Sequence, residues 1–251
     1  MNHNYFVELK KKINFILIIP VISLVFLFRD RPINALIGLI VGLGIYFYLK
    51  KLNLNRADNL LKEDSPDSLI KIYEKMYGNR YMIPENQIPV ENRILLSYSK
   101  AYIYALYGEF DQAQKSMSVI DWENQSVIHQ ALETKFKALL NYIKIKDYKE
   151  GLRLSIMANN LCMASSDSPE FYKIKDSFEL YIKIGEILTI SISKKELEAF
   201  EENLQKVKIF DSIVMAWALS IAYSNIGEAD KAIQMKTFCK KNGPYCKPLI
   251  E

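Results

Sequence analysis

Residues 101–113 read AYIYALYGEFDQA, and residues 220–232 read SIAYSNIGEADKA. In both stretches a tyrosine precedes a glycine by four positions, and an alanine follows that glycine by five. A glycine accepts the left-handed backbone that reverses a chain between two helices, and small side chains let two helices approach closely. The two stretches therefore predict two copies of one helix–turn–helix unit.

A third, weaker copy lies between these two, at residues 142–151, which read YIKIKDYKEG. It keeps the tyrosine and a small residue, but Lys146 stands where the other copies have glycine. The chain between this copy and the C-terminal one has room for further units. One of them is predicted to pair a helix at residues 171–188 with a helix at residues 194–207.

These stretches resemble the tetratricopeptide repeat, a helix–turn–helix unit of about 34 residues, although the tryptophan of that family is absent from all three. The resemblance implies a small residue where the two helices touch, an aromatic residue beside it, a turn glycine and a second small residue. The residues that it assigns to repeat packing are Ala101, Tyr104, Gly108, Ala113, Tyr142, Gly151, Ser220, Tyr223, Gly227 and Ala232. Lys231, next to Ala232, is expected to be exposed.

The rest of the chain from residue 56 onward also favours helices. Proline and glycine are sparse there and fall between periodic stretches, and no alternating apolar run indicates a hairpin of strands. We therefore expect an all-α fold, in which a linker at residues 52–65 leads into a tetratricopeptide-like α-solenoid of antiparallel helix pairs at residues 66–251. An irregular helix at about residues 66–78 is expected to cap its start.

Two uncharged apolar runs occupy residues 13–28 and 33–49. Their lengths are at the short end of what crosses a bilayer, so residues 13–51 are predicted to form a transmembrane helical hairpin. A cleaved signal peptide is disfavoured, because residues 29–32 read RDRP instead of a small-residue cleavage site. A hairpin that enters only one leaflet stays open as an alternative.

Lysines flank the predicted hairpin on both sides, in the tail of residues 1–12 and at Lys50 and Lys51. By the positive-inside rule, this favours a multi-pass protein of the cell (inner) membrane, with both termini and the repeat domain in the cytoplasm. Gly38 and Gly42 have the spacing at which small residues let membrane helices pack, within the hairpin or between copies that self-associate. Glycine is also simply common in membrane helices.

The charge of the chain is concentrated at its N-terminus. Residues 1–55 hold seven of the 33 basic residues and two of the 29 acidic residues, so the remaining 196 residues carry 26 basic and 27 acidic side chains. A nucleic-acid-binding domain usually has a basic excess on its folded part. The balanced count therefore gives no reason to expect a nucleic-acid partner.

The residues that usually carry chemistry are few and scattered. The two histidines, His3 and His129, have no histidine partner at helical spacing, and Cys162, Cys239 and Cys246 form no Cys-x-x-Cys pair. A turn-like stretch could bring the last two cysteines together, but in a cytoplasmic protein we expect packing thiols. The sequence contains no Gly-x-x-x-x-Gly-Lys-Ser/Thr, no Gly-x-Ser-x-Gly and no His-Glu-x-x-His motif. We therefore expect no catalytic residue, cofactor or metal.

Four tyrosines lie close together in the first copy, at Tyr98, Tyr102, Tyr104 and Tyr107. They are expected to pack in the core or, alternatively, to line a concave groove that takes a peptide. The sequence as a whole favours a membrane-anchored adaptor or scaffold that binds a protein or peptide. The alternatives are an immunity or antitoxin-type protein that neutralises a toxin at the membrane, and an assembly factor of a membrane complex.

Overall fold

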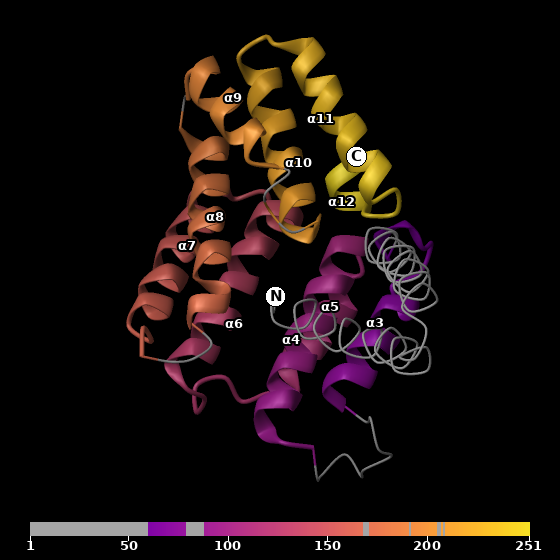
Figure 1. Cartoon of the computed structure of the whole chain (residues 1–251), viewed down its shortest axis with the longest axis vertical. Coiled ribbons are helices and arrows are strands. Elements are labelled where there is room, and N and C mark those ends of the chain that lie inside the picture. The colour runs from indigo at the N-terminus through magenta and orange to yellow at the C-terminus, as the bar shows by residue number, and fades with distance from the viewer. Residues whose placement is uncertain (1–59, 79–87, 168–170, 191, 205–206, 208) are drawn as a thin grey trace, which may run out of the picture. The chain divides into compact units, whose positions relative to one another are not determined.

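The computed structural model describes residues 60–78, 88–167, 171–190, 192–204, 207 and 209–251. Leu60–Glu251 forms one compact unit (Figure 1). Every regular element of the described residues is a helix, which confirms the all-α prediction. No helix in these ranges combines the length and the apolar character needed to cross a membrane. Residues 13–51, Gly38 and Gly42 among them, lie outside the described residues, so the membrane hairpin and its orientation stay predictions.

The first half of the unit consists of short helices followed by two long helix pairs. A 3-10 turn and α3 continue into a π-helical turn, close to the irregular helix expected at residues 66–78. The elements are η1 (Leu60–Lys62), α3 (Asp67–Tyr73), η2 (Glu74–Gly78), α4 (Val90–Tyr107), α5 (Phe110–Ser118), α6 (Val127–Leu140), η4 (Asn141–Ile145) and α7 (Tyr148–Met163).

The second half has one further helix pair and ends in a short helix. Its elements are α8 (Phe171–Thr189), α9 (Lys194–Glu202), α10 (Ile209–Asn225), α11 (Ala229–Asn242) and α12 (Lys247–Ile250). The sequence of α10, IFDSIVMAWALSIAYSN, is apolar on almost every side, and most of its side chains are buried. It lies in the middle of this half, where α8, α9, α11 and α12 all pack against it.

Three hairpins, α4 with α5, α6 with α7, and α10 with α11, correspond to the three sequence copies. The predicted pairing of the helix at 171–188 with the helix at 194–207 is wrong. Helix α8 packs against α7 and α10, whereas α9 packs mainly against α10. Leu197 is the fully buried residue of the short, highly charged α9, so this helix has too little apolar surface to cover α8.

The turns of the three hairpins share one backbone feature. Gly108, Lys146 and Gly227 have φ angles of +83°, +64° and +80°. After each glycine, the next backbone N–H donates to the carbonyl of the repeat tyrosine, Tyr104 or Tyr223, at 2.9 Å. This is the Schellman arrangement, which satisfies carbonyl groups left free at a helix end. Equal offsets in the sequence thus correspond to equal turns.

The C-terminus packs against the first hairpin. Helix α12 contacts α4 as well as α10 and α11 (Figure 1). Its Pro248 ring lies close to Gly108, because a β-carbon added to that glycine would be 3.4 Å from Cγ and Cδ of the proline. Helix α12 therefore connects the α4–α5 hairpin with the α10–α11 hairpin.

Candidate functional site

The small residues of the repeat pattern are all buried. Ala101 and Ala113 lie in the α4–α5 hairpin, and Ser220 and Ala232 lie in the α10–α11 hairpin. A larger side chain at such a place would have to displace the facing helix. These four residues therefore serve the packing of the helix pairs, and they line no surface on which a ligand could lie.

The repeat tyrosines differ in their surroundings. Tyr104 is half-buried, whereas Tyr142 and Tyr223 are completely buried. The Tyr223 hydroxyl donates to Oε2 of Glu201 at 2.9 Å, and burial raises the pKa of this phenol. In the cluster on α4, Tyr98, Tyr102 and Tyr107 are buried too. Three of the four clustered tyrosines thus belong to the core, as the packing alternative predicted, and do not form a groove.

Tyr142 is held between two glycines of different helices. A β-carbon at Gly151 on α7 would be 2.3 Å from Cε1 of its ring, and a β-carbon at Gly185 on α8 would be 2.3 Å from its hydroxyl oxygen. That hydroxyl donates to the carbonyl of Tyr181 at 3.2 Å and shares a hydrogen bond with Ser155. The sequence pattern paired Tyr142 with Gly151 but gave no sign of Gly185, whose role depends on how α8 packs.

The surroundings of the C-terminal turn allow a test of the repeat register. Gly227→Val should destabilise the unit by about 1–2 kcal/mol, because an added β-carbon meets no atom within 4 Å and the left-handed backbone is what opposes the change. Ala232→Leu should cost roughly 1–3 kcal/mol through overpacking. Chemical denaturation measures both, with Lys236→Ala on the exposed side of α11 as a control expected within about 0.5 kcal/mol. A neutral Ala232→Leu would contradict the register.

The expectation that Lys231 is exposed is wrong. Its Nζ lies 2.9 Å from Oε2 of Glu201. The Lys231 side chain is 32% exposed, and the Glu201 side chain is 19% exposed. The same carboxylate accepts the Tyr223 hydroxyl. Lys231 therefore neutralises a partly buried carboxylate between α9 and α11, and removing it should cost about 1 kcal/mol.

A cluster of buried polar side chains links four helices. Lys135 of α6 and Asp211 of α10 are 1% and 3% exposed, and Ser177 of α8 lies between them. Lys135 Nζ donates to Ser177 Oγ at 2.5 Å, and Ser177 Oγ donates to Asp211 Oδ2 at 2.9 Å. Tyr102 of α4 donates to Asp211 Oδ1 at 3.3 Å and hydrogen-bonds to the Tyr181 hydroxyl at 2.7 Å. We call these five residues the polar cluster.

Aromatic rings surround the lysine of the polar cluster. Its Nζ lies 4.3 Å from the ring centroid of Tyr181 and 5.4 Å from that of Phe178, within the range of cation–π attraction. Burial, followed by the charges of nearby groups, raises the pKa of the Tyr102 and Tyr181 phenols well above its usual range. The phenols therefore stay protonated and remain available as hydrogen-bond donors.

A lysine amine beside a serine hydroxyl can activate that hydroxyl as a nucleophile. Here the proton of Ser177 Oγ is donated to Asp211, and both side chains are almost fully enclosed. The arrangement thus joins two buried charges through a neutral hydroxyl. The polar cluster was not predicted from the sequence, although a single charge inside an apolar helix, such as Asp211 in α10, is a signal that could have indicated it.

The three cysteines are free and buried. Burial raises the pKa of the Cys162 thiol to about 11, and it raises the pKa of Cys239 and of Cys246 to about 12. A thiol in that range carries very little of the reactive thiolate at neutral pH. The cysteines therefore behave as packing residues in this structure.

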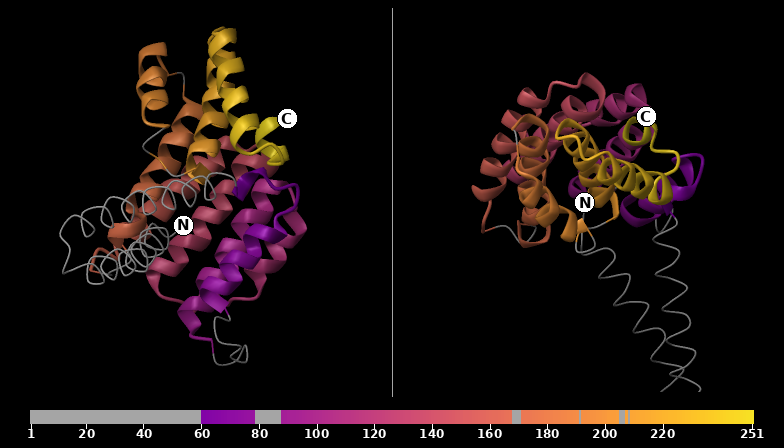
Figure 2. Two further views of the ribbon diagram at one scale, coloured as in Figure 1. Left: turned by 45° about the vertical axis from the view of Figure 1, so that its right-hand side comes forward. Right: turned by 90° about the horizontal axis from the view of Figure 1, so that it is seen from above.

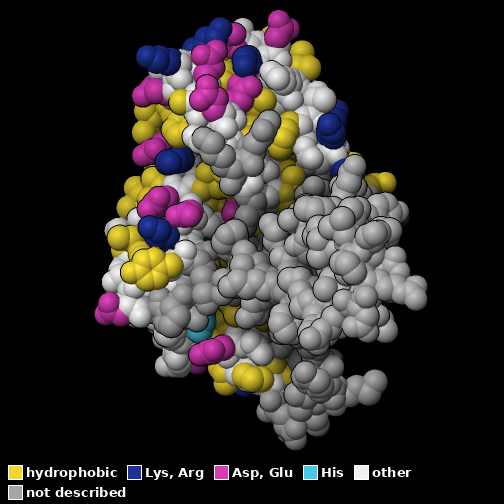
Figure 3. Space-filling model, viewed as in Figure 1, with side chains coloured by type: hydrophobic (Ala, Val, Ile, Leu, Met, Phe, Trp, Pro, Cys, Tyr) yellow, Lys and Arg dark blue, Asp and Glu magenta, His cyan; other side chains and the backbone are white. Residues whose placement is uncertain are grey.

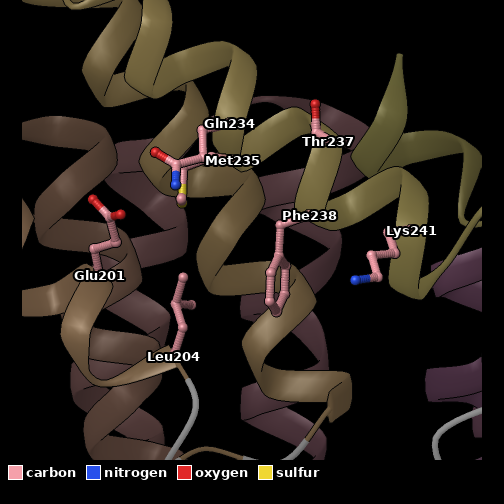
Figure 4. Close-up of a pocket in the computed structure, with 7 residues that line it drawn as sticks. All are labelled: Glu201, Leu204, Gln234, Met235, Thr237, Phe238 and Lys241. Carbon is pink, nitrogen blue, oxygen red and sulfur yellow. The ribbon is translucent and has the colours of Figure 1, made fainter.

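An open groove lies between α9 and α11, which stand apart at the same end of the unit (Figure 2). Its volume is about 260 Å³. The residues lining it are Glu201, Leu204, Gln234, Met235, Thr237, Phe238 and Lys241 (Figure 4). Leu204, Met235 and Phe238 form an apolar floor, and the polar residues form the rim. We call this feature the α9–α11 groove.

The two walls of the α9–α11 groove differ in charge. The α9 wall has Glu201, neutralised by Lys231, and the α11 wall has Lys241. Acidic and basic side chains lie close together over this end of the unit (Figure 3). An apolar floor with a charged rim suits a partner segment in which one apolar side chain is desolvated and the residues around it remain hydrated.

Among the described residues, no group of three or more histidine, cysteine, aspartate or glutamate side chains is placed to hold a metal ion. Comparison with known proteins gave no match, whether to a family model, to a curated protein or to a solved structure. The geometry of the described residues is therefore the basis on which a function can be proposed.

Proposed function

We propose that the protein is a membrane-anchored adaptor, whose helical domain holds a segment of another protein in the α9–α11 groove. The observation that carries the proposal is the groove itself, an apolar floor of Leu204, Met235 and Phe238 that is open at the surface. Helical repeat domains commonly bind peptides in grooves between their helices. The anchor is proposed from the two uncharged runs at residues 13–28 and 33–49.

The rest of the unit supports a binding role in preference to catalysis. The polar cluster is enclosed among four helices, and the thiols are buried with raised pKa values. Both features stabilise the packing and offer no reacting atom to a substrate. The α9–α11 groove, by contrast, presents side chains from two helices that are fixed by their packing on α10.

A photo-crosslinking residue at Thr237 tests the proposal in cells that make the protein. With benzoylphenylalanine at this position, on the rim of the groove, we expect an adduct that contains a second polypeptide after illumination. Gel mobility and mass spectrometry identify such an adduct. Benzoylphenylalanine in place of Lys149, which is exposed on α7, is the matched control and should give no such band. Equal labelling from both positions, or none from Thr237, would count against a binding groove.

A further inference from the structure

We infer that the α9–α11 groove takes a protein segment that inserts one large apolar side chain and places acidic residues against α11. This inference rests on the proposed function and adds the chemistry of the partner to it. It is drawn from the size of the groove, from the surface next to it and from the charge of α11.

The size of the groove favours a single anchoring side chain. Pockets that enclose drug-sized ligands or cofactors usually measure about 300–1,000 Å³. The α9–α11 groove measures about 260 Å³ and is open to solvent. Leu204 and Met235 are buried at its base, with Phe238 beside them. This space fits one large apolar side chain of a partner, which is the usual form of an anchor at a protein interface.

The apolar surface continues over the outer side of α11. Ile233 is 62% exposed, and it precedes the rim residue Thr237 by one helical turn. Lys240 follows Thr237 by three residues, so these side chains share one face of the helix. A partner whose apolar side chain enters the groove would therefore pass over Ile233 and come next to Lys240 and Lys241.

The charge of α11 determines whether acidic or basic residues are expected on that partner. Residues 231–250 contain five lysines and no acidic residue. Lys231 is paired with Glu201, but no ion pair to another described residue involves Lys236, Lys240, Lys241 or Lys247. Complementary charge steers association and excludes wrong partners. The unneutralised lysines at the groove thus select acidic residues.

The opposite wall sets the orientation of the partner. Among the described residues, Glu198 and Glu202 of α9 form no ion pair, while Glu201 is neutralised by Lys231. A segment that was acidic on every side would be repelled by α9. The partner is therefore expected to carry its acidic residues on the α11 side of the anchor, with neutral or basic residues on the α9 side.

A peptide selection tests the inference directly. The full chain in neutral detergent micelles is panned against a displayed library of random peptides of about 12 residues, and selected peptides are synthesised and measured by fluorescence anisotropy. We expect enriched sequences to combine a large apolar residue with nearby Asp or Glu. Their affinity should fall as the salt concentration rises, because exposed charges are screened.

Two variants locate the binding site. Lys240→Glu with Lys241→Glu should weaken the selected peptides at least tenfold, and Thr237→Trp, which fills the groove mouth, should do the same. The matched control is Lys149→Glu with Lys183→Glu, which reverses two exposed lysines on α7 and α8 and should change the affinity less than twofold. Circular dichroism and unchanged unfolding midpoints establish that each variant is folded.

The other outcomes separate this inference from the proposed function. Peptides that lack acidic residues, but whose affinity is lowered by Thr237→Trp, would overturn the inference and leave the binding groove in place. Peptides unaffected by both variants would overturn the groove as the site. Absence of any enriched peptide would overturn both proposals. If the chain in phosphatidylcholine nanodiscs instead bound phosphatidylglycerol vesicles through Lys240 and Lys241, the partner would be a lipid surface and the inference would fail.

Discussion

Lys135→Met should lower the free energy of unfolding by about 3–5 kcal/mol, the size of loss expected when one charged member of a buried hydrogen-bonded network is removed. Methionine retains most of the volume of lysine, so packing accounts for little of the effect. What changes is that Ser177, which donates to the buried Asp211, loses the ammonium group that donates to it. A buried carboxylate is less stable when the hydrogen-bonded network around it loses a positive charge.

Chemical denaturation followed by tryptophan fluorescence measures this loss. The two tryptophans of the chain, Trp122 and Trp217, both lie in the described unit and are buried, so the signal reports on this unit alone. Lys137→Met is a matched control two residues further along α6. Lys137 is more than half exposed and pairs with Glu133 on the same helix, so its loss should cost less than about 0.5 kcal/mol.

A double variant shows whether the effect belongs to the charges. Asp211→Leu alone removes the carboxylate to which Ser177 donates and should also be strongly destabilising. Combined with Lys135→Met, it should cost less than the sum of the two single changes, by roughly 1–3 kcal/mol. If Lys135→Met proved no worse than Lys137→Met, the two charges of the polar cluster would not depend on each other.

Gly151→Ala should destabilise the unit by about 2–3 kcal/mol, although the same change stabilises most helices. Alanine has the higher helix propensity by about 1 kcal/mol. At this position, however, the added carbon would lie 2.3 Å from a ring atom of Tyr142, which is completely buried and cannot turn aside. Overpacking therefore outweighs propensity.

The sign of the change is the decisive observation for Gly151. Thermal or chemical unfolding of Gly151→Ala should show a lower midpoint, whereas Asn160→Ala, at an exposed position of the same helix, should leave it unchanged or raise it slightly. A midpoint for Gly151→Ala at or above that of the unchanged protein would mean that Tyr142 does not occupy the space between α7 and α8.

The features that could be predicted from the sequence are local ones. Each left-handed turn follows its tyrosine by four residues, so the chain near Gly108 and Gly227 contains all that is needed to form it. Helical periodicity is local in the same way, and the all-α fold follows from it. Even the helix at 171–188 was located to within a residue or two, while its packing partner was not.

The features that could not be predicted depend on contacts between distant residues. Tyr102 and Asp211 are 109 positions apart in the chain and meet only where the fold brings side chains of α4, α8 and α10 together. The same holds for Lys231 and Glu201, which are 30 positions apart in the chain and form an ion pair. Because of this contact the lysine is half-buried, although the sequence suggests that it is exposed. A groove such as the one between α9 and α11 depends on which helices fail to touch, and periodicity carries no information about that.

Contact between α12 and α4 gives the unit a property that an open repeat array lacks. In an open array each repeat touches only its neighbours, so the ends can fray and further repeats can be added. Here Pro248, near the last residue, lies against the turn at Gly108 in the first hairpin. Loss of α12 would thus remove contacts from α4 in the first hairpin. The contact between α12 and α4 therefore couples the C-terminal helix to the first hairpin, so unfolding of one is expected to weaken the other.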